Sequence, residues 1–388
     1  MTSPIFYYNV ADVLVPVLAI VINICLYERY KTKNKRVNQV LVLMIVEHSI
    51  MTVFYYLMTL QGGNFDALGY FNRGVVNSQY YLGRVDFRFG TPALIYIVHY
   101  LNKLLGLNYF ALYWPFSILG LIGIVRTFKV SSSIISERWT NLFYLFLLPN
   151  LHFWSCALGK DALAMYAIGS IIYLVFFQKK IVNCIFAVIL FSMVRVHIVA
   201  LVAFAFLITV IFKGNIISFK GRILTVFVML VLAIPGYVAI SETIALQDAQ
   251  SINEKFQELE QTTAEGGSTV NMQGKNIIVK WTSYLFRPLF FDARNLLTFL
   301  ASLENTVWVL LFFYYIKSCA ERKRLRYEKD RLSFFYWFSI FSILSISIPN
   351  AAIMYNLGLA MRQKYMFFPF VLMVIFILKS NSRKGNYI

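Results

Sequence analysis

The chain has 388 residues, of which 59% are hydrophobic and only 14% charged, and its formal net charge is +18. A soluble protein needs more polar residues than this to cover its surface, so the composition excludes an ordinary soluble fold. The positive charge would indicate nucleic-acid binding in a soluble protein, but in a membrane protein the positive-inside rule accounts for it. We therefore predict an all-α, polytopic transmembrane helical bundle with no nucleic-acid partner.

Apolar runs recur along the whole chain, and several approach the roughly 20 residues that cross a bilayer. In chain order, the predicted spans number about eleven: 10–26, 39–60, 109–125, 140–156, 162–177, 181–194, 198–212, 223–240, 296–316, 332–348 and 365–378. Segment 91–107 is also apolar, but its His99, Asn102 and Lys103 are typical of an interfacial helix that lies along the membrane. Residues 1–388 are expected to form a single integral membrane domain.

The distribution of charge predicts the topology, with the N-terminus outside and the C-terminus cytoplasmic. The cytoplasmic segments are then 27–38, 126–139, 178–180, 213–222, 317–331 and 379–388. They carry nearly two thirds of the Lys and Arg, and their net charge accounts for the whole +18. Two long loops, 61–108 and 241–295, become extracytoplasmic.

Charged side chains that have no evident structural purpose gather on the predicted outer face. The candidate site residues are Asp66, Arg88, Lys160, Asp161, Arg195, His197, Arg287, Asp292, Arg294, Glu304 and Arg362. Glu304 lies ten residues after Arg294, about 15 Å along a helix. A carboxylate at that depth in a bilayer is costly and is usually functional.

Arginine dominates this set, and its guanidinium grips phosphate oxygens bidentately and stays charged when partly buried. A single arginine at a helix end is more often a topology residue, and Lys160–Asp161 could equally be a solvated pair that closes a hairpin. His48 and His99 fit helix packing, Glu47 fits pairing within the bundle, and His152 fits packing and function equally well.

No metal-site spacing and no Walker loop occurs in the sequence, so we expect no metal and no cofactor.

Five segments carry a resemblance to a known family: FDALGYF, FGTPALIYIVHYLNKLLGLNYFAL, LPNLHFWSCALGKDALAMY, MVRVHIVAL and NLGLAMRQKYMFFP. In pattern and order, across about two thirds of the chain, the sequence resembles the bacterial polysaccharide polymerases of the Wzy type, including the exopolysaccharide polymerase EpsG relatives. It departs from them at Val196, where related chains often have proline. FRPLFFDARN is a further segment of this kind, with Asp292 where glutamate is expected.

The resemblance implies a glycosyltransferase of the bacterial inner membrane. Such an enzyme transfers a growing glycan from undecaprenyl diphosphate to a hydroxyl of an incoming lipid-linked oligosaccharide repeat, among membrane lipids and with a chain-length regulator as a partner. Arg195, Arg287, Arg294 and Arg362 would bind the diphosphate with help from Lys160, and Arg88, Asp161 and Asp292 would complete the substrate site. Asp66 or His197 would be the base, and Glu304 would orient an arginine or share that task.

Two other functions stay open. A glycosyltransferase that uses a polyprenyl-monophosphate sugar, or a glycan ligase, fits Asp66 and the following interfacial helix equally well. A lipid-linked oligosaccharide flippase or other secondary transporter belongs to a different class. Transporters bind substrate near the midplane, often between repeated halves. The sequence shows no convincing repeat, and its charges gather at one face, which makes transport the less favoured hypothesis.

The topology has a direct test. A reporter fused after Lys329 should be cytoplasmic, and one inserted near Gly266 should be outside, because the charge balance separates these two loops. The measurement is the activity of a compartment-specific reporter at each position. Finding both reporters on one side would overturn the predicted arrangement.

Overall fold

The computed structural model describes residues 9–62, 65–177, 181–213, 268–272, 274–321, 331–354 and 356–380. Helices make up 83% of these residues and no strand occurs among them, so the all-α prediction is confirmed for the described part. The chain forms two compact units, Met1–Val196 and His197–Ser380, and each is described by itself. The prediction of a single membrane domain stays a prediction.

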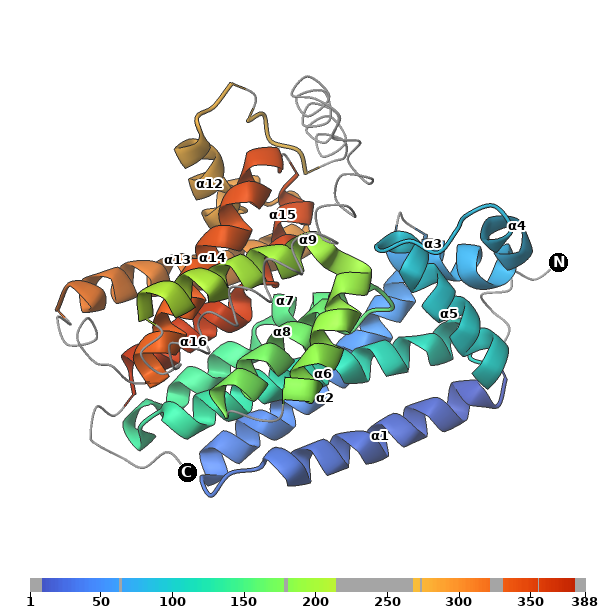
Figure 1. The fold of residues 1–388 in the computed structure, drawn as a ribbon, viewed down its shortest axis with the longest axis horizontal. Coiled ribbons are helices and arrows are strands. Elements are labelled where there is room, and N and C mark those ends of the chain that lie inside the picture. Colours follow the sequence, from blue (N-terminus) through green and yellow to red (C-terminus); the bar gives the residue numbers. More distant parts are fainter. Residues whose placement is uncertain are drawn as a thin grey trace. The chain divides into compact units, whose positions relative to one another are not determined.

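The first unit contains a series of long helices joined by shorter ones (Figure 1). Its elements are α1 Ala11–Tyr30, α2 Lys35–Leu60, α3 Asp66–Phe71, the π-helix η2 Asn72–Val76, α4 Ser78–Leu82, α5 Thr91–Leu105, α6 Tyr109–Ile134, the 3₁₀-helix η3 Glu137–Leu147, α7 Pro149–Ser155, α8 Lys160–Phe176 and the first half of α9 Ile181–Lys213. The predicted outer loop 61–108 is therefore mostly helical, because α3, η2 and α4 precede the expected helix α5.

Helix α5 has the features expected of an interfacial helix. Pro92 stands in its first turn, and Gly106 ends it in the left-handed conformation that favours glycine. Its 15 residues span only about 22 Å, which is shorter than the hydrocarbon core. One face, with Leu94 and Val98, is fully buried, while Leu104 is 73% exposed. Its position along the membrane surface stays a prediction.

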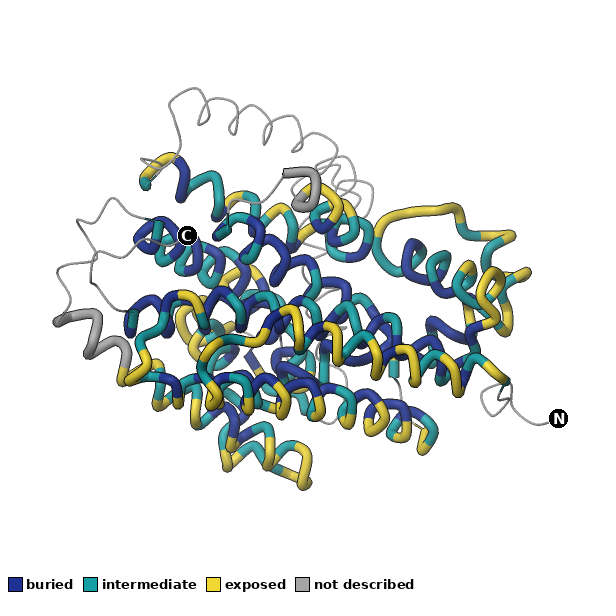
Figure 2. The backbone as a smooth tube through the Cα atoms, turned by 90° about the horizontal axis from the view of Figure 1, so that it is seen from below, coloured by how far each residue is buried: buried dark blue, intermediate teal, exposed yellow. Residues whose placement is uncertain are grey.

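Six described helices are long and apolar enough to cross a membrane: Ala11–Tyr30, Lys35–Leu60, Tyr109–Ile134, Ile185–Lys213, Leu296–Tyr314 and Arg331–Ile353. The number rises to eight if each of two bent helix pairs is one span. On α1, apolar side chains such as Leu14 and Leu18 are more than half exposed (Figure 2, yellow). A helix that is apolar on its exposed face is suited to lipid rather than to water. The chain is therefore a multi-pass membrane protein, and the number of eleven spans and their orientation stay predictions.

Glycines bring α6 and α8 into close contact. A Cβ added at Gly123 would lie 2.1 Å from the carbonyl oxygen of Met165, and one added at Gly169 would lie 2.0 Å from that of Gly123. Membrane helices that lack a hydrophobic driving force often associate in this way, because small residues let two backbones approach. This contact fixes α8, whose first turn carries Lys160 and Asp161.

The predicted span 140–156 is wrong as a single α-helix. Residues Glu137–Leu147 form a 3₁₀-helix, Leu148 is extended, and α7 begins at Pro149. A residue before proline avoids the α conformation, which explains the break at Leu148. Helices α7 and α8 then meet at a bend of 116°, the geometry of a broken span or a re-entrant loop.

The predicted spans 181–194 and 198–212 are not separated by a loop. They are the two halves of α9, which continues through a kink where Arg195 has non-helical backbone angles, φ −147° and ψ 62°. The predicted span 223–240 lies outside the described residues.

The second unit contains the rest of α9 together with α12 Ile277–Phe286, the 3₁₀-helix η5 Phe290–Asp292, α13 Leu296–Glu321, α14 Arg331–Ile353, α15 Leu357–Lys364 and α16 Phe368–Leu378. The predicted outer loop 241–295 lies outside the described residues up to position 267, and its described part contains α12 and η5. Its outer position stays a prediction. The predicted span 365–378 begins later, at Phe368, and α15 precedes it at a bend of 54°.

The glycine contact between α6 and α8 predicts a loss of stability on substitution. Gly123→Ala should destabilise the protein by about 1–3 kcal/mol, because the new methyl group meets backbone that cannot move aside. Gly159→Ala is the control, since its Cβ would lie 3.8 Å from the nearest atom, on Tyr70. Unfolding midpoints in detergent measure both variants, and equal midpoints would contradict the proposed packing.

Candidate functional site

In the first unit, the predicted site residues Asp161 and Arg195 form an ion pair. The Arg195 guanidinium donates through Nη2 to Oδ1 of Asp161, and the two side chains are only 12% and 6% exposed. Asp161 lies in the first turn of α8, where the helix dipole favours a negative charge, and Arg195 lies at the kink of α9. The kink therefore places a guanidinium against the beginning of another helix.

Lys160 adds a second cation beside this pair. Its ammonium group donates to the hydroxyl of Thr91 at 2.9 Å, at the beginning of α5. The backbone N–H of Gly90 donates to the carbonyl of Met193 at 2.7 Å, and Gly90 has a φ of +99° that side chains rarely adopt. The beginnings of α5 and α8 thus converge on the kink of α9, with Lys160, Asp161 and Arg195 at the junction.

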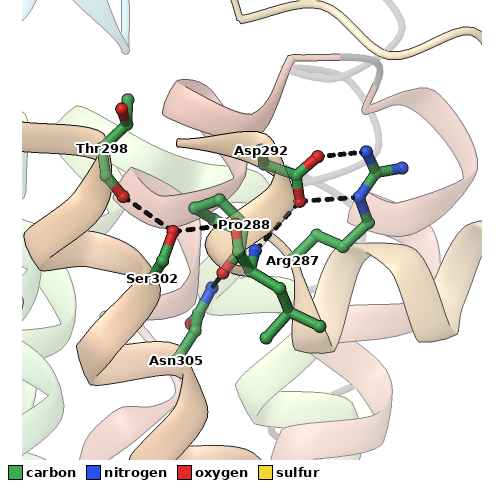
Figure 3. Close-up of polar contacts among 7 residues, drawn as sticks. Arg287, Pro288, Asp292, Thr298, Ser302 and Asn305 are labelled. Carbon is green, nitrogen blue, oxygen red and sulfur yellow. Dashed lines mark hydrogen bonds and ion pairs between the residues drawn. The ribbon is translucent and has the colours of Figure 1, made fainter. Parts of the chain in front are cut away.

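In the second unit, Arg287 and Asp292 form a bidentate ion pair (Figure 3). Nε of Arg287 donates to Oδ2 of Asp292 at 3.0 Å, Nη2 donates to Oδ1, and the N–H of Leu289 donates to Oδ2 at 2.9 Å. Partial burial opposes ionisation, but these hydrogen bonds lower the pKa of Asp292 below its ordinary value. Asp292 therefore stays ionised at neutral pH, and its stabilising contribution is lost only as the pH falls through that lowered pKa.

Helix α13 holds this segment through its side chains. Ser302 donates to the carbonyl of Leu289 and Asn305 to that of Pro288, each at 3.0 Å (Figure 3). The neighbouring residue Glu304 is 5% exposed and accepts from the indole of Trp308 at 3.4 Å. Its depth in the bilayer stays a prediction.

Lys364 is a member of this cluster that the candidate list omitted. It is 2% exposed, and its ammonium group donates to the carbonyl of Arg287 at 2.5 Å and to Oδ1 of Asn305 at 3.4 Å. It also interacts electrostatically with Glu304. Helical spacing could have indicated that Lys364 is buried. It follows the buried Met361 by three residues and so shares its face of α15.

Other predicted residues lie at more open positions. Asp66 begins α3, Arg88 precedes α5, His197 follows the kink of α9 and Arg294 precedes α13; all four are exposed. Arg362 is half-buried in the last turn of α15. Their roles stay predictions.

A pair of histidines from distant segments also meets inside the first unit. Nδ1 of His48 lies 3.0 Å from Nδ1 of His152, and both residues are buried. Nε2 of His48 lies 3.0 Å from the carbonyl of Ser117, and Nε2 of His152 lies 2.7 Å from that of Phe146. Since a carbonyl only accepts, both Nε2 atoms donate, and the contact between the two Nδ1 atoms needs one proton between them. Glu47 lies 3.7 Å from Nε2 of His152, so a carboxylate accompanies the pair.

No protein-family model, no curated protein and no solved structure matches the chain. The resemblance to Wzy-type polymerases rests on the five sequence segments alone.

The burial of the Asp161–Arg195 pair predicts a strong effect of breaking it. Asp161→Asn should cost about 3–5 kcal/mol of stability, because it leaves Arg195 buried beside a neutral group. The double variant with Arg195→Gln should lose less than the sum of the two single variants.

Unfolding in increasing SDS, followed by tryptophan fluorescence, measures the stability of the wild type, the two single variants and the double variant. Glu28→Gln is the control, because Glu28 pairs with Lys31 on the exposed surface and its loss should change little. Additive effects of Asp161→Asn and Arg195→Gln would show that the two side chains are not coupled.

Proposed function

We propose that the protein is a glycosyltransferase of the bacterial inner membrane, which polymerises undecaprenyl-diphosphate-linked oligosaccharide repeats on the extracytoplasmic face. The observation that carries the proposal is the buried Asp161–Arg195 pair at the kink of α9, beside Lys160. A buried ion pair contributes little to stability compared with apolar side chains of similar size. Its place at a break in an apolar helix therefore favours a role in binding an anionic substrate.

The chemistry of the transfer sets the demands on this protein. A hydroxyl oxygen of the acceptor repeat attacks the anomeric carbon of the donor glycan, the bond from that carbon to the diphosphate oxygen breaks, and the diphosphate leaves with the electron pair. Cationic groups that neutralise the developing charge lower the barrier. Arg195 and Lys160 in the first unit and Arg287, Arg294 and Arg362 in the second have the required charge.

The carboxylates divide into two groups by their contacts. Asp161 and Asp292 each bind an arginine, and Asp292 has a lowered pKa, so both are suited to positioning a guanidinium rather than to accepting a proton. Asp66 and His197 are exposed, and each has a group that can take the hydroxyl proton. This exposure favours Asp66 or His197 as the base, and the interaction of Glu304 with Lys364 favours an orienting role for Glu304.

Substitution of the arginines tests the proposal. Arg294→Ala and Arg195→Ala should lower polymerisation by about thirty- to a thousandfold, the equivalent of about 2–4 kcal/mol, because each removes one cation from the departing diphosphate. Arg294 is exposed, so its loss should leave the fold intact. The measurement is the length distribution of surface polymer in cells that lack the native gene.

Arg138→Ala is the matched control, because Arg138 is also exposed and stacks against Trp139 in a predicted cytoplasmic segment. Membrane levels of each variant are measured in the same cells. Normal polymer with Arg294→Ala and Arg195→Ala at wild-type protein levels would remove both residues from the mechanism.

A further inference from the structure

A cationic cavity lies in the first unit, and none of its lining residues belongs to the Asp161–Arg195 pair. It has a volume of about 490 Å³ and is bounded by the last turn of α1, the second half of α6, the part of α8 from Tyr166 to Leu174 and the beginning of α9. Tyr173, in its wall, lies twelve residues after Asp161 on α8, which is about 18 Å along the helix. The cavity therefore extends toward the C-terminal end of α8, whereas the ion pair lies at its beginning.

Arg126 is the central cation of this cavity. Its Nη1 donates to the hydroxyl of Ser170, and its guanidinium lies 5.2 Å from the ring centre of Tyr166 and 6.0 Å from that of Tyr173. Its Nε is buried and has no hydrogen-bond partner among the described residues. A buried N–H donor without an acceptor is costly, and Arg126, as a lining residue, presents its positive charge to the cavity.

Arg29 adds a second positive charge from the end of α1. Its guanidinium lies 5.8 Å from the ring centre of Tyr30, which also lines the cavity. No carboxylate is among the lining residues, and the neighbouring Glu28 pairs instead with Lys31. Within the described part of the chain, no ion pair joins Arg29 or Arg126 to an acidic side chain. Two guanidinium groups thus face one cavity without a protein counter-charge.

Phosphate is the anion that fits this arrangement. A guanidinium group forms a fork that grips two oxygens of one phosphate, and tyrosine hydroxyls supply further donors. The remaining wall is apolar, with Leu174 inside and Phe186 59% exposed at the boundary of the unit. A lipid satisfies both features, because its phosphate is charged and its chains are apolar, whereas a free phosphate satisfies only the first.

We propose that this cavity binds the phosphate group of a membrane lipid between Arg29 and Arg126. By the predicted topology, the site lies at the cytoplasmic boundary, where anionic lipid headgroups and basic side chains meet. The bound phosphate accepts from the guanidinium groups of Arg126 and Arg29, and the lipid chains lie along Leu174 and Phe186. The site does not depend on the proposed transfer reaction, since it shares no residue with it.

Lipid binding to the purified protein tests the site. Delipidated protein in a neutral detergent is titrated with phosphatidylglycerol, and bound lipids are counted by native mass spectrometry. The wild type should retain one lipid per chain more tightly than Arg126→Gln or Arg29→Gln, by about tenfold or more for each lost charged hydrogen bond. Arg36→Gln is the control, because Arg36 is exposed on α2 and does not line the cavity.

A second arm adds inorganic phosphate in millimolar excess. It should leave the lipid in place, and displacement would show that the cavity takes a free phosphate instead. Equal lipid retention by the wild type, Arg29→Gln and Arg36→Gln would overturn the proposal. Arg29 lies at an exposed helix end, so this comparison holds even where Arg126→Gln fails to fold.

Discussion

The Asp161–Arg195 ion pair is the contact on which the first unit's site depends. A charge inside an apolar bundle is tolerable only where a partner and hydrogen bonds offset its loss of water. The pair meets this condition because α9 departs from helical geometry at Arg195 and because close glycine packing holds α8 against α6. The same physical rule governs the second unit, where Arg287 and Asp292 form a bidentate pair and the buried Lys364 takes oxygen acceptors from the backbone and from Asn305.

The contacts of the charged residues differ. Asp161 and Asp292 each bind an arginine, and hydrogen bonds from Arg287 and Leu289 hold the pKa of Asp292 below its ordinary value. Asp66 and His197 lie at exposed positions. The cationic cavity around Arg126 is lined by Tyr166, Tyr173 and Leu174 of α8, so positive charge lies against two separate parts of one apolar helix. Within that unit, charge is thus concentrated where lipid headgroups would lie if the helices cross the membrane as predicted.

Hydropathy and charge predicted the helical class and placed α1, α2, α6, α13 and α14 close to their observed positions, because long apolar runs dominate those segments. Hydropathy does not distinguish a 3₁₀-helix from an α-helix, so the break at Leu148 was missed although Pro149 marks it. The ten-residue α12 was missed because Lys280 and Thr282 interrupt its apolar pattern. The partners of the predicted charged residues depend on tertiary contacts, which residue types alone do not give. The contact of His48 with His152 joins residues 104 positions apart, and no local pattern predicts it.

The central claim is that the charged groups at the kink of α9 and around Arg287 serve glycosyl transfer from a lipid diphosphate. The most direct measurement uses purified protein in liposomes that contain a single lipid-linked repeat unit, with the products identified by mass spectrometry. The account predicts that glycans of two and more repeats appear together with one released undecaprenyl diphosphate for each glycosidic bond formed, and that Arg294→Ala lowers both by about thirty- to a thousandfold. Repeats that cross the bilayer without being joined would contradict the account and would identify the protein as a transporter.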